Sequence, residues 1–145
     1  MNNTIAEVQV TYVPTKKKSV QISTSQAAEK CVRNFWNEHI AYKESFYILL
    51  LNRANKVLGY HLLSTGGTTA TVVDVRVILQ LLIKSNSNGF ILAHNHPSGN
   101  TTPSELDKKL TKQVKEAAEL FDVKLLDHLI ITSDSYLSMA DEGLL

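Results

Sequence analysis

The chain has 145 residues, of which 43% are hydrophobic and 20% are charged, and these proportions are typical of a globular protein with one core. Its formal net charge of +1 argues against a strong nonspecific attraction to nucleic acid. The single cysteine, Cys31, excludes an internal disulfide and a zinc site built from several cysteines.

The N-terminal residues predict a strand and an arm rather than a targeting segment. Val8, Val10 and Tyr12 alternate with polar residues, as in a half-buried strand, and a continuous apolar signal core is absent. The longest apolar run covers residues 46–51, whereas a membrane span needs about 20 residues. We therefore expect no membrane association, a cytoplasmic location, an N-terminal strand and arm over 1–23, and one domain over 24–145.

The remaining chain predicts helices and strands that interleave. Ala28, Cys31, Val32, Phe35 and Trp36 recur at helical spacing, so they are expected to face a core. Interleaved strands and helices indicate an α/β fold in which a mixed sheet is flanked by helices. The predicted helices cover 23–40, 72–86 and 103–122, and the predicted strands cover 45–51, 56–64, 88–94, 123–133 and 135–140.

Residues 93–107, AHNHPSGNTTPSELD, contain a candidate metal site. His94 and His96 are two residues apart at the end of a predicted strand, so both side chains point to the same face. Asp107 follows in the first turn of the next helix, after a connection whose proline and glycine residues permit a sharp turn. Two imidazoles and one carboxylate leave the fourth position of a zinc ion open, as in a catalytic site.

The same residues also have a structural interpretation. Ser104 and Asp107 form an S-x-x-D pattern at a helix start, where Ser104 would cap the helix and Asp107 would favour its dipole. A pair of histidines on a loop can simply be polar surface. The joint pattern H-x-H-P-x(6)-S-x-x-D is much stricter than either part, and it lies at a strand–loop–helix junction of the kind that often holds a site.

Hydrolysis by a metal-activated water also needs a carboxylate that moves the proton without being a ligand. Glu44 is the candidate, because it precedes the most apolar predicted strand and so lies near the edge of the sheet where the histidines also lie. Alternatively, Glu44 is an ordinary exposed acid at the start of a strand and has no role in a site.

Together, Glu44 and the H94-N-H96-P…S104-x-x-D107 pattern resemble the JAMM (JAB/MPN) metallohydrolases. The longer ILAHNHPSGNTTPSELD, the later DHLIIT and the terminal MADEGLL resemble the RadC branch of that family. The resemblance implies a cytidine-deaminase-like three-layer α/β sandwich and one zinc ion held by His94, His96 and Asp107. It also implies that Glu44 is the acid/base and that Ser104 polarises the substrate carbonyl and stabilises the developing oxyanion.

The activity that this resemblance implies is hydrolysis of amide or isopeptide bonds, with a peptide or peptide conjugate as substrate. Many JAMM enzymes have Ser or Thr between the histidines, whereas this chain has Asn95, as the RadC branch does, which argues against ubiquitin-type specificity. RadC proteins commonly carry a helix-hairpin-helix region, for which this sequence has no room, so a short stand-alone domain is expected.

Two further residues are candidates to orient a ligand. His128 is predicted either to fill the core or to contact the site, with the core favoured, and Asp127 is a candidate to orient a ligand imidazole. Among rival functions, a base deaminase would need the P-C-x-x-C ligands that this chain lacks. A two-histidine-one-carboxylate iron oxygenase, a non-catalytic MPN scaffold and a DNA repair or recombination factor remain as alternatives.

Overall fold

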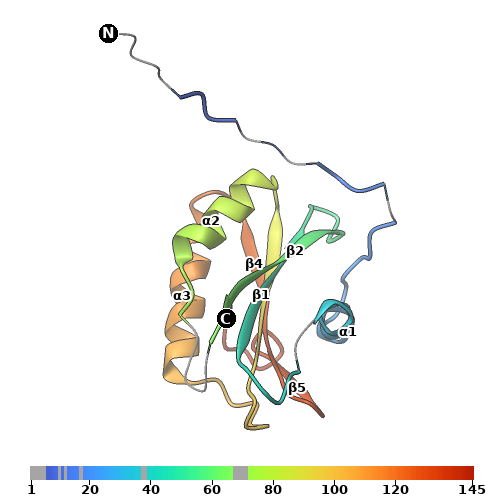
Figure 1. Ribbon diagram of the computed structural model, residues 1–145, viewed down its shortest axis with the longest axis vertical. Coiled ribbons are helices and arrows are strands. Elements are labelled where there is room, and N and C mark those ends of the chain that lie inside the picture. Colours follow the sequence, from blue (N-terminus) through green and yellow to red (C-terminus); the bar gives the residue numbers. More distant parts are fainter. Residues whose placement is uncertain (1–5, 10, 12, 17, 37–38, 67–71) are drawn as a thin grey trace.

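Helices and strands alternate along the chain in the computed structural model, which describes residues 6–9, 11, 13–16, 18–36, 39–66 and 72–145. The order of elements is α1-β1-β2-α2-β3-α3-β4-β5 (Figure 1). The helices are α1 (Ser25–Phe35), α2 (Val75–Lys84) and α3 (Glu105–Glu119), and the strands are β1 (Ser45–Leu51), β2 (Val57–Thr65), β3 (Gly89–Asn95), β4 (Lys124–Ile131) and β5 (Tyr136–Ser138).

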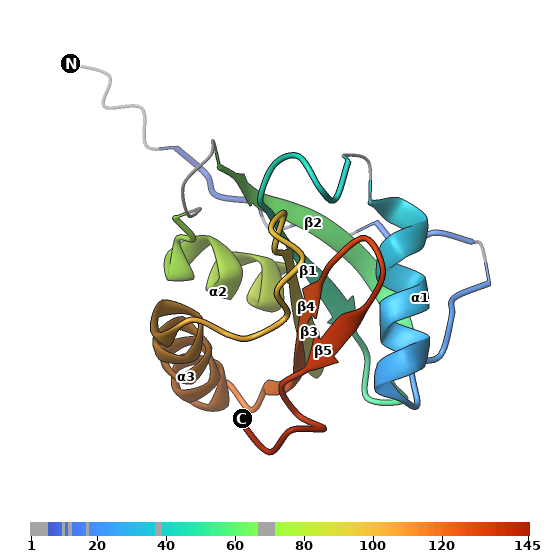
Figure 2. The same cartoon turned by 90° about the horizontal axis from the view of Figure 1, so that it is seen from below.

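The strands form one mixed sheet in the order β2-β1-β3-β4-β5. Only β3 and β4 pair in parallel, with α3 as the connection between them, and the other neighbouring strands pair antiparallel. Helix α1 covers one face of the sheet, and α2 and α3 cover the other (Figure 2). The predicted three-layer α/β sandwich with a mixed central sheet is therefore confirmed.

The two faces of the sheet bury two separate cores. Side chains alternate between the faces along β1 and β3, and both strands are buried throughout because they lie inside the sheet with helices on both sides. His94 continues the series that faces α2 and α3, whereas Asn95 faces the other side. The α2–α3 core includes Phe46, Ile48, Leu50, Phe90 and Leu92, and the α1 core includes Leu49, Leu51, Ile91 and Ala93.

Helix α1 packs as its periodicity predicts. Ala28 and Val32 are buried, and Cys31, Phe35 and Trp36 pack against the same core. Thr24, rather than a neighbouring serine, caps the helix, because its hydroxyl accepts a hydrogen bond from the backbone N–H of Ala27 at 3.1 Å. None of the helices in the described ranges is both long and apolar enough to cross a membrane.

The N-terminal strand that the alternation around Val8 predicts is absent from the described residues. Residues 6–9 and 11 have no regular structure, and Val10 and Tyr12 lie outside the described part of the chain. Figure 1 shows this arm running away from the sheet. The arm meets the domain at Gln21, which forms an isolated antiparallel bridge with Lys56 beside the start of β2.

Candidate metal centre

The imidazole rings of His94 and His96 converge at the end of β3. His94 is the buried penultimate residue of the strand, and His96 follows directly after it and is partly exposed. Their Nε2 atoms are 3.0 Å apart. The ring of His94 also stacks on Phe46 of the neighbouring strand, with centroids 5.1 Å apart and planes within 3° of each other, which holds the orientation of this imidazole.

Asp107 brings a carboxylate to the same point. Its Oδ1 lies 3.3 Å from Nε2 of His94, and its Oδ2 lies 3.4 Å from Nε2 of His96. Asp107 is also part of a capping box, because its side chain accepts from the Ser104 N–H at 2.8 Å and its own N–H donates to the Ser104 hydroxyl at 3.0 Å. The capping and the metal-site interpretations of Asp107 are therefore compatible, since the cap aims its carboxylate at the histidines.

The separations between these donor atoms match a tetrahedral ion. Bonds of 2.0–2.1 Å to a tetrahedral zinc place neighbouring ligand atoms about 3.4 Å apart. The Nε2 atoms of His94 and His96 are 3.0 Å apart, and each lies at a similar distance from a different oxygen of Asp107, 3.3 Å from Oδ1 and 3.4 Å from Oδ2 respectively. The donor set and its spacing therefore fit a small divalent cation without any large movement of the side chains.

Glu44 lies beside the histidines at the entrance to β1. A carboxylate oxygen of Glu44 and ring nitrogens of His94 and His96 all lie within 4.8 Å of one another, so these three residues form a cluster that could hold a metal ion. The backbone carbonyl of Glu44 accepts from the N–H of Gly66 at 2.8 Å.

Asn95 fastens the segment that carries Glu44. Its buried side chain donates to the carbonyls of Ile40 and Lys43, each at 2.6 Å, and accepts from the N–H of Ser45 at 2.7 Å. Asn95 thus donates two hydrogen bonds and accepts one, whereas the single hydroxyl proton of Ser or Thr could replace only one of the two donors. The residue between the two histidines therefore links the strand of the ligands to the segment of the carboxylate.

Replacing Asn95 with Ala should lower turnover by about 100-fold and leave metal content unchanged, because a small displacement of Glu44 weakens proton transfer strongly. Parallel measurement of bound metal and of substrate cleavage tests this expectation. Asn34→Ala, on the exposed surface of α1, is the matched control. Joint loss of metal and turnover in Asn95→Ala would instead mean that the residue acts through the strand that carries the histidines.

The hydrogen bonds at His96 favour metal binding through Nε2. Its Nδ1 lies 2.6 Å from the carbonyl oxygen of Asn100, which can only accept, so Nδ1 carries the proton and Nε2 faces the site. The hydrogen bond with Asp107 raises the pKa of His96, although partial burial opposes this. Partial burial alone would raise the pKa of Asp107, but the neighbouring imidazoles of His94 and His96 outweigh it and hold that pKa well below its ordinary value.

Ser104 lies at the rim of the site. Its hydroxyl oxygen accepts from Asp107, which leaves the hydroxyl proton free to point into a cavity of about 480 Å³ that Ser104 lines together with Glu44 and His96. A second cavity of about 430 Å³ is also lined by Glu44 and His96. Apolar residues line much of the first cavity, namely Phe46, Val72, Leu106 and Leu110, and the second includes Tyr42, Ser98, Asn100 and Thr102.

The prediction that Asp127 orients a ligand imidazole is wrong. The register between β3 and β4 shifts after Phe90, so that Ile91 pairs with Asp127 and Leu92 pairs with His128. The shift turns Asp127 toward the α1 side and His128 toward α3. His128, for which the core interpretation was favoured, is fully buried and also touches the site, since its Nε2 lies 2.8 Å from Nδ1 of His94.

Asp127 instead fastens the chain around β5. Its carboxylate accepts from the N–H of His128 at 2.7 Å, the N–H of Ala140 at 3.0 Å and the hydroxyl of Ser138 at 2.6 Å. Burial raises the pKa of the Asp127 carboxyl above its ordinary value, and the three hydrogen bonds oppose this only in part.

Asp127→Ala should therefore lower the free energy of unfolding by about 2–4 kcal/mol, because buried donors lose their acceptor. Asp127→Asn keeps an acceptor for both N–H groups and should stay close to the wild type. A raised folded pKa means that folding favours the protonated acid. The stability of the wild type relative to Asp127→Asn should thus be highest below the ordinary Asp pKa and fall as the pH rises through the raised pKa. Denaturant unfolding across a pH series measures both effects, and a relative stability that rises with pH would contradict the second.

The sequence model of the RadC-like JAB domain matches residues 22–144, which is most of the chain and includes the whole site. The chain belongs to the RadC family. Relatives of this RadC-family chain are named UPF0758 proteins. One from Flavobacterium johnsoniae is 50% identical over 101 residues, which cover 70% of this chain and 44% of the relative.

Two other relatives cover different shares of the RadC-family chain. The UPF0758 protein YfjY of Escherichia coli is 39% identical over 103 residues, covering 71% of this chain and 64% of the relative. A UPF0758 protein of Fusobacterium nucleatum is 37% identical over 131 residues, covering 89% and 55%. The chain spans about half the length of the relatives that it matches.

The geometry of the site indicates, beyond family membership, that the domain could bind a metal ion. A RadC-like JAB domain, a mixed sheet between helices and the cluster of Glu44, His94 and His96 together describe a domain that could bind a metal ion at the end of β3.

Thr111, which contacts His128, was not predicted from the sequence, because a threonine at a buried helix position has no distinguishing pattern.

Proposed function

We propose that this RadC-family domain is a zinc-dependent hydrolase that cleaves amide or isopeptide bonds in peptides or peptide conjugates. The observation that supports it most is the convergence of His94, His96 and Asp107 at separations of 3.0 to 3.4 Å, with Glu44 beside them. Two neutral imidazoles and one carboxylate are a donor set that zinc hydrolases use.

His94, His96 and Asp107 would hold the metal, and Glu44 would remain outside its ligand set. A bound zinc would supply Lewis-acid chemistry, lowering the pKa of a water and polarising the scissile carbonyl. The negative carboxylate of Asp107 offsets part of the ion's charge, and its capping box with Ser104 holds it in place. These assignments give each of the polar residues around the site a separate role.

Glu44 would act as the general base and then as the general acid. From its position beside the histidines, its carboxylate takes a proton from the attacking water and passes that proton to the leaving amine nitrogen. Ser104 would donate its free hydroxyl proton to the carbonyl oxygen of the substrate, where negative charge develops in the transition state. Both groups lie on the same cavity wall, which suits a single reacting carbonyl between them.

The shape of the surface supports an extended substrate. Glu44 and His96 line two cavities, of about 430 and 480 Å³, so an extended chain could pass these residues with part of its length in each cavity. A small molecule would fill only one of these cavities. Peptides and peptide conjugates are therefore the substrate class that we propose.

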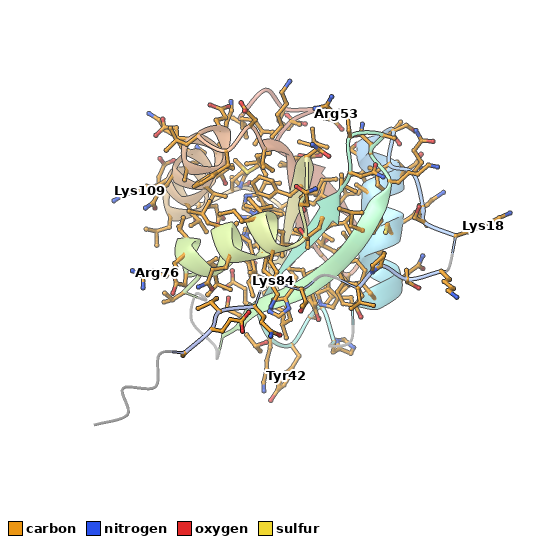
Figure 3. All side chains as sticks on the ribbon, turned by 90° about the horizontal axis from the view of Figure 1, so that it is seen from above. Lys18, Tyr42, Arg53, Arg76, Lys84 and Lys109 are labelled. Carbon is orange, nitrogen blue, oxygen red and sulfur yellow. The ribbon has the colours of Figure 1, made fainter. Side chains whose placement is uncertain are left out.

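The charge distribution gives the nucleic-acid alternative less support. The labelled side chains of Lys18, Arg53 and Lys109 in Figure 3 point outward from the N-terminal arm, the β1–β2 turn and α3, rather than gathering on one face. With a net charge of +1, this chain alone lacks a strong electrostatic footprint for DNA. A non-catalytic scaffold, in turn, has no need for the convergence of two histidines with two carboxylates.

A screen against a library of peptides and isopeptide-linked conjugates tests the proposed function. The protein is first stripped with a chelator and then reloaded with zinc, and each form is incubated with the library. Cleavage that appears only on reloading, and is absent from Glu44→Gln, is the expected result. Cleavage that survives complete removal of the metal, or no cleavage by fully zinc-loaded protein across the library, would contradict the proposal.

A further inference from the structure

A buried chain of hydrogen bonds leads away from the site and returns to it. Nδ1 of His94 lies 2.8 Å from Nε2 of His128, and Nδ1 of His128 lies 2.6 Å from the hydroxyl oxygen of Thr111. The hydroxyl of Thr111 in turn donates to the backbone carbonyl of Asp107 at 2.5 Å. The chain therefore connects two of the proposed ligands through two residues that touch no substrate cavity of the site.

The chemistry of its members fixes the direction of the protons. A carbonyl oxygen can only accept, and that of Asp107 lies much closer to the Thr111 hydroxyl than the weakly accepting sulfur of Met139 at 3.8 Å. The single proton of Thr111 is therefore used on Asp107. The hydroxyl oxygen of Thr111 must then accept from His128, which places a proton on Nδ1 of that ring. One proton remains for the contact between His94 and His128.

That last proton belongs to His94. If Nε2 of His128 also carried a proton, the ring would be a cation with no exposed surface, and its nitrogens face an alcohol and another imidazole instead of a carboxylate. A neutral His128 therefore accepts at Nε2, and His94 donates from Nδ1.

We infer that Thr111 and His128 are positioning residues that hold His94 as its Nδ1–H tautomer and so present an unprotonated Nε2 to the metal. The inference rests on the proposed metal site, but it concerns the protein before metal enters. It explains why a histidine and a threonine occupy the core between β4 and α3, where apolar side chains would otherwise pack. The stacking of Phe46 on His94 acts in the same direction, because it opposes rotation of the ring away from this hydrogen bond.

Asp107 contacts this chain of hydrogen bonds through two different groups, its carboxylate and its backbone carbonyl. Its carboxylate approaches His94 directly, and its carbonyl determines the tautomer of His94 through Thr111 and His128. The first turns of α3 therefore orient two of the three proposed ligands at once. Histidine ligands in metalloproteins are commonly held by such hydrogen bonds, and loss of one costs about 10–100-fold in metal affinity.

The tautomers can be observed directly in the metal-free wild type. Nitrogen-15 chemical shifts and long-range nitrogen–proton couplings of the imidazoles distinguish protonated from unprotonated ring nitrogens. We expect protons on Nδ1 of both His94 and His128 and an unprotonated Nε2 on His128. A proton on Nε2 of His128 overturns the inference whether or not the protein later binds zinc.

Variants test the consequence for metal affinity. Thr111→Val keeps the shape of the side chain and removes the hydroxyl, and it should weaken zinc binding by about 10–100-fold in competition with a chromophoric chelator. His128→Leu should do the same, whereas His128→Gln should recover part of the affinity, because its amide oxygen can accept from His94. Thr111→Ser, which keeps the hydroxyl, and His61→Leu, on exposed β2, are the controls and should bind as the wild type does.

The outcomes separate this inference from the proposed function. Wild-type protein that binds no zinc contradicts the proposed function, while the nitrogen-15 spectrum still decides the tautomers. Zinc affinity that is unchanged in Thr111→Val and in His128→Leu overturns the positioning role and leaves the hydrolase proposal intact. Thermal unfolding of each metal-free variant shows whether it is folded, and if Thr111→Val is not, the tautomers of the wild type decide the inference alone.

Discussion

Glu44→Gln should bind zinc as the wild type does and lose about 10²–10⁴-fold in turnover. The amide keeps the size of the side chain and can still form hydrogen bonds, but it cannot take a proton from water, and general base catalysis contributes about this factor. The ligands His94, His96 and Asp107 are unchanged in this variant, so metal content should not change. Zinc by elemental analysis and turnover with a substrate from the conjugate screen are the two measurements.

Glu119→Gln at the C-terminal end of α3 is the matched control, because it removes the same charge from an exposed position. It should retain both zinc and turnover. Full activity in Glu44→Gln would remove Glu44 from the mechanism. Loss of zinc from Glu44→Gln would instead mean that the carboxylate of Glu44 is a metal ligand. The cluster that Glu44 forms with His94 and His96 is compatible with that role.

His96→Ala should weaken zinc binding by more than about 100-fold. Removing a ligand should cost more than removing a residue that orients one, for which the loss is about 10–100-fold. His96 is partly exposed and lies after the end of β3, so the fold should remain intact. A zinc titration against a chromophoric chelator measures the affinity, and far-ultraviolet circular dichroism checks the fold.

His61→Ala is the control for this substitution, since His61 is exposed on β2 and belongs to no part of the site. Its zinc affinity should equal that of the wild type. Zinc affinity in His96→Ala within a few-fold of the wild type would contradict the assignment of His96 as a ligand. Loss of circular dichroism signal would instead identify His96 as a structural residue.

The features that could be predicted from the sequence are those that residues close together along the chain determine. Apolar runs and alternation predicted the strands and the helices on both faces of the sheet, and the spacing of His94, His96 and Asp107 predicted their convergence. Spacing of this kind survives folding because a strand end and a helix start each determine side-chain directions locally. The error at the start of α1 follows from competition among neighbouring capping residues at 23–25.

The parts that sequence analysis missed depend on contacts between strands. An unbroken register from Phe90 onward would have put Asp127 opposite Leu92 and toward α3, where it was predicted to orient a ligand. The observed shift puts His128 there instead. The shift depends on how the two strands pair, so the alternation of side chains along β4 alone does not locate it. The role of Asn95 was missed for a similar reason, since its partners lie 50 or more residues earlier in the chain.

We propose that His94, His96 and Asp107 meet around one divalent cation and leave one side of it open. Diffraction from zinc-loaded crystals, recorded on both sides of the zinc absorption edge, tests it most directly. We expect one anomalous peak about 2.0–2.1 Å from Nε2 of His94, Nε2 of His96 and a carboxylate oxygen of Asp107, with Glu44 farther away. An anomalous map with no peak between these residues, or a peak bonded to Glu44 while Asp107 only caps α3, would contradict it.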